Sequence, residues 1–124
     1  RDALLMKASH INHPSNIWLR QSKDNYIWLY QMWACLLREY TYRYGKVHAC
    51  ARLIDVLAEI PHNLQDVPFN EPTPAMPDEC KIPNDSLKSY HKYYNERKTH
   101  FAKWTKRDMP PWYSPVILNN NANI

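Results

Sequence analysis

Apolar and polar positions alternate with a helical period along one long stretch, from Lys23 to Tyr44. At about 100° per residue, this run places large apolar side chains on one broad face, and a second apolar line lies beside it. We expect neighbouring elements to wrap most of this helix, because only a narrow strip of its surface is polar. The broad face comprises Tyr26, Leu29, Trp33, Leu36, Leu37, Tyr40 and Tyr44, the second line Trp28, Met32 and Cys35, and the polar strip Lys23, Asp24, Gln31 and Arg38.

Residues at both ends of this run predict where the helix starts and stops. Ser22 is a typical N-cap, and Asp24 suits the positive end of the helix dipole. Gly45, the single glycine of the chain, is the natural residue just past a helix C-terminus, because glycine adopts left-handed geometry without steric cost. We therefore predict a helix that ends at Gly45 and a sharp turn into a second helix.

The second helix is predicted over Val47–Glu59, with one apolar and one polar side, and Pro61 ends it. Residues 61–83 contain six prolines and no periodicity, which predicts an extended loop over the helices. We expect ordered contacts there because apolar residues are spaced along it like anchors. These residues are Leu64, Val67, Phe69 and Met76.

Shorter signals define the two ends of the chain. A helical turn is expected within residues 2–8, and Ser15 would cap a short helix that carries Ile17, Trp18 and Leu19. Asn84 or Asp85 would cap a last long helix that reaches about Lys106, after which Trp112 docks on the body. The prediction is an all-α fold: a compact bundle of a long central helix and two or three flanking helices, with a Pro-rich loop. It forms one domain over residues 1–113, followed by a disordered tail at 114–124.

Composition agrees with a globular domain. The 124 residues are 44% hydrophobic and include nine Tyr and five Trp, enough for an aromatic core. No apolar run is long enough to span a membrane and no signal peptide is evident, so we expect a cytoplasmic protein. Cys35, Cys50 and Cys80 are odd in number and widely spaced, which favours buried free thiols. The chain begins at Arg1 rather than Met, so further N-terminal elements are expected.

Positive charge is concentrated late in the chain. The net charge is +4, yet residues 86–107 contain seven Lys or Arg and one acid, a local balance of +6 that leaves −2 elsewhere. Such a segment indicates either a surface for polyanions or an ordinary solvated helix face. For nucleic acid, cations would follow the backbone and rings would stack on bases; the alternative is that the rings are core. The candidate cations, on one face of the last helix, are Lys88, Lys92, Lys103 and Lys106.

Arg97 falls within a stripe of aromatic residues on the last helix. A guanidinium among packed rings needs a partner, because a buried unpaired charge is very costly. Its partner is either an internal carboxylate such as Glu39, or a phosphate or carboxylate of a ligand bound between helices.

Glu39 continues the second apolar line of the long helix, and the turn at Gly45 would gather Glu39, Arg43, Lys46 and His48. A carboxylate against aromatic surface can serve as a general acid or base, and His48 can do the same. The alternative is an i,i+4 ion pair between Glu39 and Arg43.

Six histidines raise the possibility of a metal site, but their spacing does not fit one. His10 and His13 have no cysteine or acid close enough in sequence to complete a ligand set. No metal or cofactor is therefore expected. His13, before Pro14, is better explained as a turn histidine whose ring bonds to backbone.

Several strings resemble a family of small proteins of tailed phages and environmental sequences, over about residues 7–113. They are HINHP with Trp18, EYTYRYGKVH, AMPDECK, and the segment from Tyr93-Tyr94 through Lys103-Trp104-Thr105 to Pro111-Trp112. Members carry an added N-terminal segment rich in charged residues and His, and no activity carries over from them.

The chain is also similar, more faintly, to phage pyrimidine-dimer DNA glycosylases of the endonuclease V type. The likeness comprises a His-Pro turn, an aromatic helix that ends in an acid and then Arg-Tyr-Gly, and a late Tyr-Tyr segment. Those enzymes use an N-terminal α-amine and a nearby glutamate. Arg1 and the missing N-terminal helix depart from that pattern, so the resemblance implies the fold rather than catalysis.

Together these patterns predict a phage-type protein associated with DNA, RNA or a nucleotide. Arg43, Lys46 and Arg97 would hold phosphate, and Glu39 or His48 would move protons if the protein is an enzyme. Two alternatives remain: an interaction module without catalysis, such as a homodimer, or a fragment of an enzyme that lacks its catalytic N-terminus. The full pocket set is His13, Glu39, Arg43, Lys46, His48 and Arg97, with Asp78, Glu79 and Lys81 from the loop.

Overall fold

The computed structural model describes residues 5–115. All regular elements in this range are helices, so the fold is all-α, as the periodicity predicts. The chain divides into two compact units, Arg1–Pro72 (unit 1) and Thr73–Ile124 (unit 2). A division of this kind does not say whether the units unfold together, so the single domain over residues 1–113 stays a prediction.

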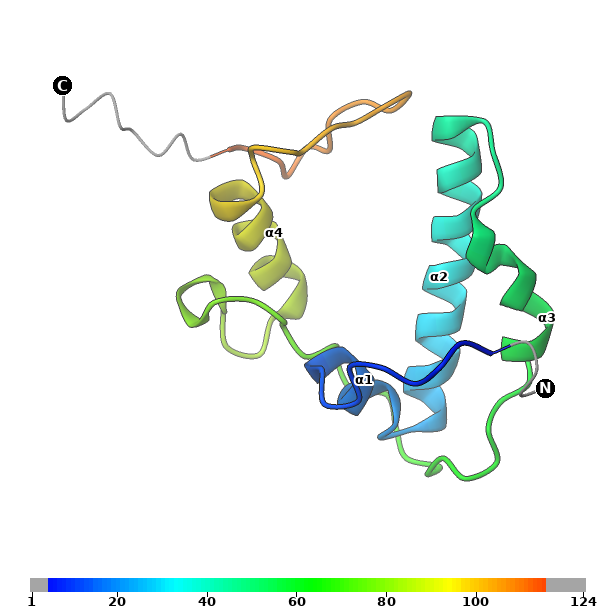
Figure 1. Ribbon diagram of the computed structural model, residues 1–124. Coiled ribbons are helices and arrows are strands. Elements are labelled where there is room, and N and C mark those ends of the chain that lie inside the picture. The colour runs from blue at the N-terminus through cyan, green and yellow to red at the C-terminus, as the bar shows by residue number, and fades with distance from the viewer. Residues whose placement is uncertain (1–4, 116–124) are drawn as a thin grey trace, which may run out of the picture. The chain divides into compact units, whose positions relative to one another are not determined.

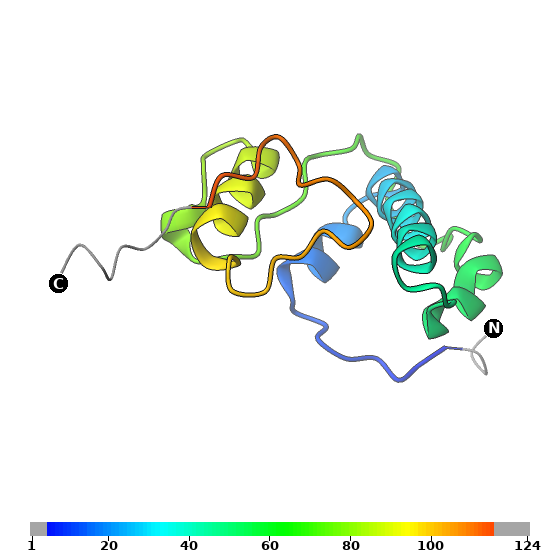
Figure 2. The same cartoon turned by 90° about the horizontal axis from the view of Figure 1, so that it is seen from above.

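Unit 1 contains the longest helix of the described residues, α2 (Lys23–Tyr44), and three shorter elements (Figure 1). Helix α1 (Pro14–Leu19) precedes α2. A 3₁₀ helix, η1 (Ala49–Leu53), leads directly into α3 (Ile54–Leu57), and this pair runs alongside α2 in both views (Figures 1 and 2).

Both predicted ends of α2 are confirmed. The Ser22 hydroxyl accepts a hydrogen bond from the Asn25 amide at 3.1 Å. Gly45 is left-handed, at φ 68° and ψ 19°, and its amide donates to the Thr41 carbonyl at 2.8 Å. The chain therefore leaves α2 by a glycine cap that satisfies one of the free carbonyls of the last turn.

The second helix starts later than the expected Val47–Glu59, and it begins with 3₁₀ rather than α-helical geometry. The His48 ring accepts a hydrogen bond from the Cys50 amide at 3.0 Å, so His48 is the N-cap and Val47 lies outside the helix. The first turn then adopts 3₁₀ geometry, and α-helical geometry covers only Ile54–Leu57. The order of apolar and polar side chains predicts helical turns in this region, and such turns are present. The same order does not distinguish an α-helix from a 3₁₀ helix.

A histidine also caps α1, in place of the expected Ser15. The His13 Nδ1 atom accepts from the Ser15 amide at 3.1 Å, and Pro14 occupies the first helical position, where proline is favoured. His13 is thus the turn histidine that the sequence predicts. Residues 5–9 form no helix, so the turn expected over 2–8 is wrong there, and residues 2–4 lie outside the described range.

The core of unit 1 centres on Trp18, which is 2% exposed. Phe69 of the extended loop meets Trp18 edge to face, with ring centroids 5.9 Å apart, as expected of an anchor. The loop is also bound through its backbone, because the Lys23 amide donates to the Gln65 carbonyl at 2.9 Å. The proline-rich segment of this unit is therefore ordered against α1 and α2.

Elements of unit 1 cover only part of helix α2, which corrects the expectation that neighbours wrap most of it: Trp28 packs against Trp18 and Phe69 near its start, with ring centroids 5.8 Å apart in each pair. The Tyr26 and Tyr30 hydroxyls donate to the carbonyls of Leu57 and Ile54, at 2.6 and 2.8 Å. Further along the helix Met32 is 45% exposed, and Cys35 is exposed rather than the buried thiol predicted. The pattern identifies apolar positions but not which of them gain a partner.

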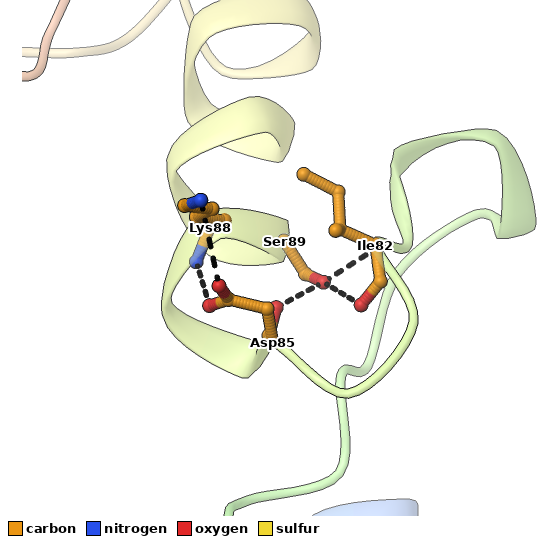
Figure 3. A network of polar contacts seen from close by, with 4 residues as sticks. All are labelled: Ile82, Asp85, Lys88 and Ser89. Atoms are coloured by element: carbon orange, nitrogen blue, oxygen red, sulfur yellow. Dashed lines mark hydrogen bonds and ion pairs between the residues drawn. The ribbon is translucent and has the colours of Figure 1, made fainter.

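Unit 2 is built around α4 (Ser86–Arg97), preceded by the short 3₁₀ turn η2 (Asp78–Cys80). Asp85 caps α4 by accepting from the Lys88 amide at 2.9 Å. The buried Ser89 hydroxyl accepts from the Ile82 amide at 2.8 Å and lies 2.7 Å from the Asp85 carbonyl (Figure 3). This network fixes the direction in which the chain enters α4.

Helix α4 ends at Arg97, well before the expected Lys106. Asn95 donates to the Trp112 carbonyl at 3.3 Å and accepts from the Ser114 amide at 2.9 Å. These contacts hold the returning segment against the last turn of α4, and this tertiary contact overrides the helical pattern of residues 98–106. Trp112 docks on α4 as predicted. Of the tail expected at 114–124, residues 116–124 lie outside the described range.

Candidate nucleic-acid interface

Aromatic rings of the segment after α4 form a cluster on that helix. The Trp112 ring is stacked on His91, with centroids 4.2 Å apart and planes 6° from parallel. Trp104 meets Trp112 at 6.3 Å and Tyr113 at 5.3 Å. The sequence leaves two alternatives for these rings, a buried core or exposed rings on which bases stack. All of them are half-buried and in contact with one another, so they match neither alternative.

One ring of this region stands out by its exposure. Phe101 is 54% exposed, and the Lys98 ammonium lies 5.0 Å from its centroid and 4.9 Å from that of Tyr93. A cation held between two ring faces in this way is a favourable arrangement. Sequence reasoning counted Lys98 only as a charge, although aromatic residues at i−5 and i+3 were a signal for it.

The four predicted lysines are not on one helix face. Lys88 and Lys92 lie on α4, whereas Lys103 and Lys106 follow its end, which corrects the predicted arrangement. Lys88 lies 3.9 Å from the Asp85 carboxylate, and Lys103 is exposed with no ion pair to any described residue. Lys106 has a left-handed φ of 60° and lines a solvent-open depression with its two neighbours, Arg107 and Asp108.

Arg97 binds a carboxylate of its own unit. Its Nη2 lies 2.8 Å from Glu79 Oε1, with the two side chains 44% and 60% exposed. Of the alternatives for Arg97, the internal carboxylate is therefore present, as Glu79 rather than Glu39. Lys81 binds Asp78 in the same turn, at 2.9 Å.

The two residues proposed for proton transfer lie on either side of the Gly45 cap, Glu39 in α2 and His48 at the start of η1. Glu39 accepts from Arg43 Nε at 2.7 Å, the i,i+4 pair that the sequence offers as the alternative to catalysis. His48 uses Nδ1 as a helix cap and meets the Tyr40 ring at 4.9 Å. Lys46 is exposed just past Gly45. Of the predicted pocket, unit 1 thus brings Glu39 and Arg43 into contact.

Cations beside aromatic rings define the candidate chemistry of unit 2. Within residues 5–115, no group of three His, Cys, Asp or Glu side chains is arranged to hold a metal ion. No described helix is both long and apolar enough to cross a membrane.

Comparisons with protein families, curated proteins and solved structures find no match to this chain. The resemblance to phage proteins and glycosylases stays a prediction.

Proposed function

We propose that residues 86–113 bind single-stranded nucleic acid, with Phe101 as the platform on which a base stacks. The observation that carries this proposal is the 54% exposed Phe101 ring beside Lys98, in the most basic segment of the chain. Proteins that bind single strands without sequence preference combine such rings with cations that follow the backbone.

Charge supports the same surface. Residues 86–107 have a local balance of +6. The exposed Lys103 pairs with no carboxylate among residues 5–115, so it can neutralise a phosphate without first losing one. Arg107 and Lys106 add cations at the open depression that follows. A single strand that passes Phe101 would meet these cations in sequence along its backbone.

Fluorescence anisotropy with a labelled oligo-dT tests the proposal on the full chain. Phe101→Ala should weaken binding about 5- to 100-fold, the range typical of a lost base–aromatic contact, whereas Phe101→Tyr should retain it. Tyr42→Ala is the matched control, because Tyr42 is an exposed ring of unit 1, outside the binding segment, with a similar exposure of 49%. Equal affinities for Phe101→Ala and the native chain would refute the stacking platform.

Salt dependence gives a second, independent reading. Lys103→Gln should reduce the slope of log affinity against log salt by about 0.7, the value for one phosphate contact on a single strand. Lys46→Gln, an exposed lysine of unit 1, should leave the slope unchanged. A slope that falls with Lys46→Gln and not with Lys103→Gln would move the phosphate site to the turn after α2.

A further inference from the structure

His100 lies beside the exposed ring of Phe101, in the turn that follows α4 (residues 98–101). The two ring centroids are 4.6 Å apart and the ring planes cross at 81°, so the imidazole does not cover Phe101 as a parallel ring would. Both side chains are exposed, Phe101 at 54%. A base stacked on Phe101 would therefore lie next to the imidazole of His100.

The fold does not use the His100 ring in the way that it uses other histidines. His13 and His48 accept backbone hydrogen bonds as helix caps, and His91 is stacked on Trp112. No hydrogen bond or ion pair joins the His100 ring to another residue of the described part of the chain. Its two ring nitrogens therefore offer hydrogen bonds that the described fold does not use.

Cations outnumber carboxylates around His100. The Lys98 ammonium lies 5.0 Å from the centroid of the Phe101 ring that His100 contacts. A proton on His100 adds another positive charge to this group, and an anion bound there offsets the repulsion, so proton uptake and phosphate binding are coupled. The charged and titratable groups around this turn are Tyr93, Glu96 and Arg97 of α4, Glu79 of η2, which pairs with Arg97, and Lys98 and Lys103 of the following segment.

We propose that His100 is a phosphate ligand of the strand that stacks on Phe101, and that it binds the phosphate in its protonated form. This inference rests on the proposed function and adds to it a dependence on pH. A neutral imidazole has one N–H donor, whereas the imidazolium has two donors and a positive charge. Because histidine changes charge near neutral pH, the affinity for a single strand should rise as the pH falls through this range.

Anisotropy titrations of the full chain with labelled oligo-dT at about pH 8 and about pH 5.5 test this role, because the two values bracket the titration of histidine. Neither thymine nor a phosphodiester changes charge between them. The native chain should bind about 5-fold more tightly at the lower pH, and His100→Gln should lose most of this gain. His100→Arg keeps a cation at both pH values, so at the higher pH it should bind nearly as tightly as the native chain does at the lower one.

His62→Gln is the matched control, because His62 is an exposed histidine of unit 1 and its loss should leave the pH dependence of the native chain. As a second reading, the slope of log affinity against log salt should be about 0.7 larger for the native chain than for His100→Gln at about pH 5.5, and equal for the two at about pH 8. Circular dichroism verifies that each variant is folded. A gain at low pH that is the same in the native chain and in His100→Gln, or equal slopes at both pH values, would overturn the role of His100 and leave the Phe101 platform intact. No binding at either pH would refute the platform as well.

Discussion

Asn25 of α2 and Asn70 of the extended loop hydrogen bond to each other twice, across 45 residues of sequence. Asn25 Nδ2 donates to Asn70 Oδ1 at 2.9 Å, and the Asn70 amide donates to Asn25 Oδ1 at 3.2 Å. Asn25 also donates to the Trp18 carbonyl, and the Trp18 indole donates to the Asn70 carbonyl, each at 2.9 Å. The buried asparagine thus joins α1, α2 and the loop.

Removal of the Asn25 side chain should therefore destabilise unit 1. Asn25→Ala leaves the Asn70 amide without its acceptor and removes one of the donors to the Trp18 carbonyl, which should lower the free energy of unfolding by about 2–3 kcal/mol. Urea denaturation followed by tryptophan fluorescence measures this change. Gln31→Ala, the loss of an exposed amide on the same helix, is the control and should stay within about 0.5 kcal/mol. Equal losses for the two variants would contradict the role assigned to Asn25.

The left-handed cap of α2 predicts a backbone effect at Gly45. A Cβ there would meet no atom within 4 Å, so any cost of Gly45→Ala comes from the φ of 68° rather than from a clash. We expect Gly45→Ala to lower stability by about 1 kcal/mol and Gly45→Asn to lower it less, because asparagine tolerates this conformation. Thermal unfolding compares the two. A stabilising alanine would show that the cap is not left-handed in solution.

The histidine cap of η1 predicts how His48 contributes to stability, through its cap hydrogen bond or through its ring contact with Tyr40. His48→Ala removes the acceptor for the Cys50 amide and should reduce stability by about 1 kcal/mol, whereas His48→Asn supplies another good cap and should recover most of it. Urea denaturation of both variants measures the difference. If both destabilise equally, the contact of the ring with Tyr40, rather than the cap, accounts for the effect.

Local signals in the sequence predicted the ends of α2 because a serine cap and a left-handed glycine act through their own backbone. The end of α4 could not be predicted in the same way. It depends on Asn95 bonding to the Trp112 carbonyl, 17 residues later, and helical periodicity continues past it. The ion pairs differ in the same way. The sequence offered the pair of Glu39 and Arg43 as an alternative because the two residues lie one helical turn apart. The pair of Arg97 and Glu79 could not be predicted, because it depends on how the η2 turn packs against α4.

The ion pair of Arg97 predicts a gain rather than a loss of nucleic-acid affinity. Glu79→Gln frees the guanidinium from its carboxylate and removes one negative charge near the basic segment, so oligo-dT should bind about 3-fold more tightly at low salt. Asp66→Asn makes the same change in net charge in unit 1, where Asp66 is exposed and pairs with no cation of the described residues, and is the control for anisotropy titrations. Unchanged affinity for Glu79→Gln would place Arg97 outside the nucleic-acid path.

The buried hydroxyl of Ser89 gives a test of whether the two units unfold together. Ser89→Ala leaves the Ile82 amide without its acceptor, at a cost of about 1–3 kcal/mol to the packing at the start of α4. If the units are separate folding units, amide hydrogen exchange should accelerate across 82–97 and stay unchanged across 23–44, and Asn25→Ala should give the reverse pattern. If instead either substitution accelerates exchange in both ranges equally, the chain unfolds as one cooperative domain. Ser114→Ala is a suitable control, because the exposed Ser114 contacts Asn95 through its backbone amide, which alanine retains.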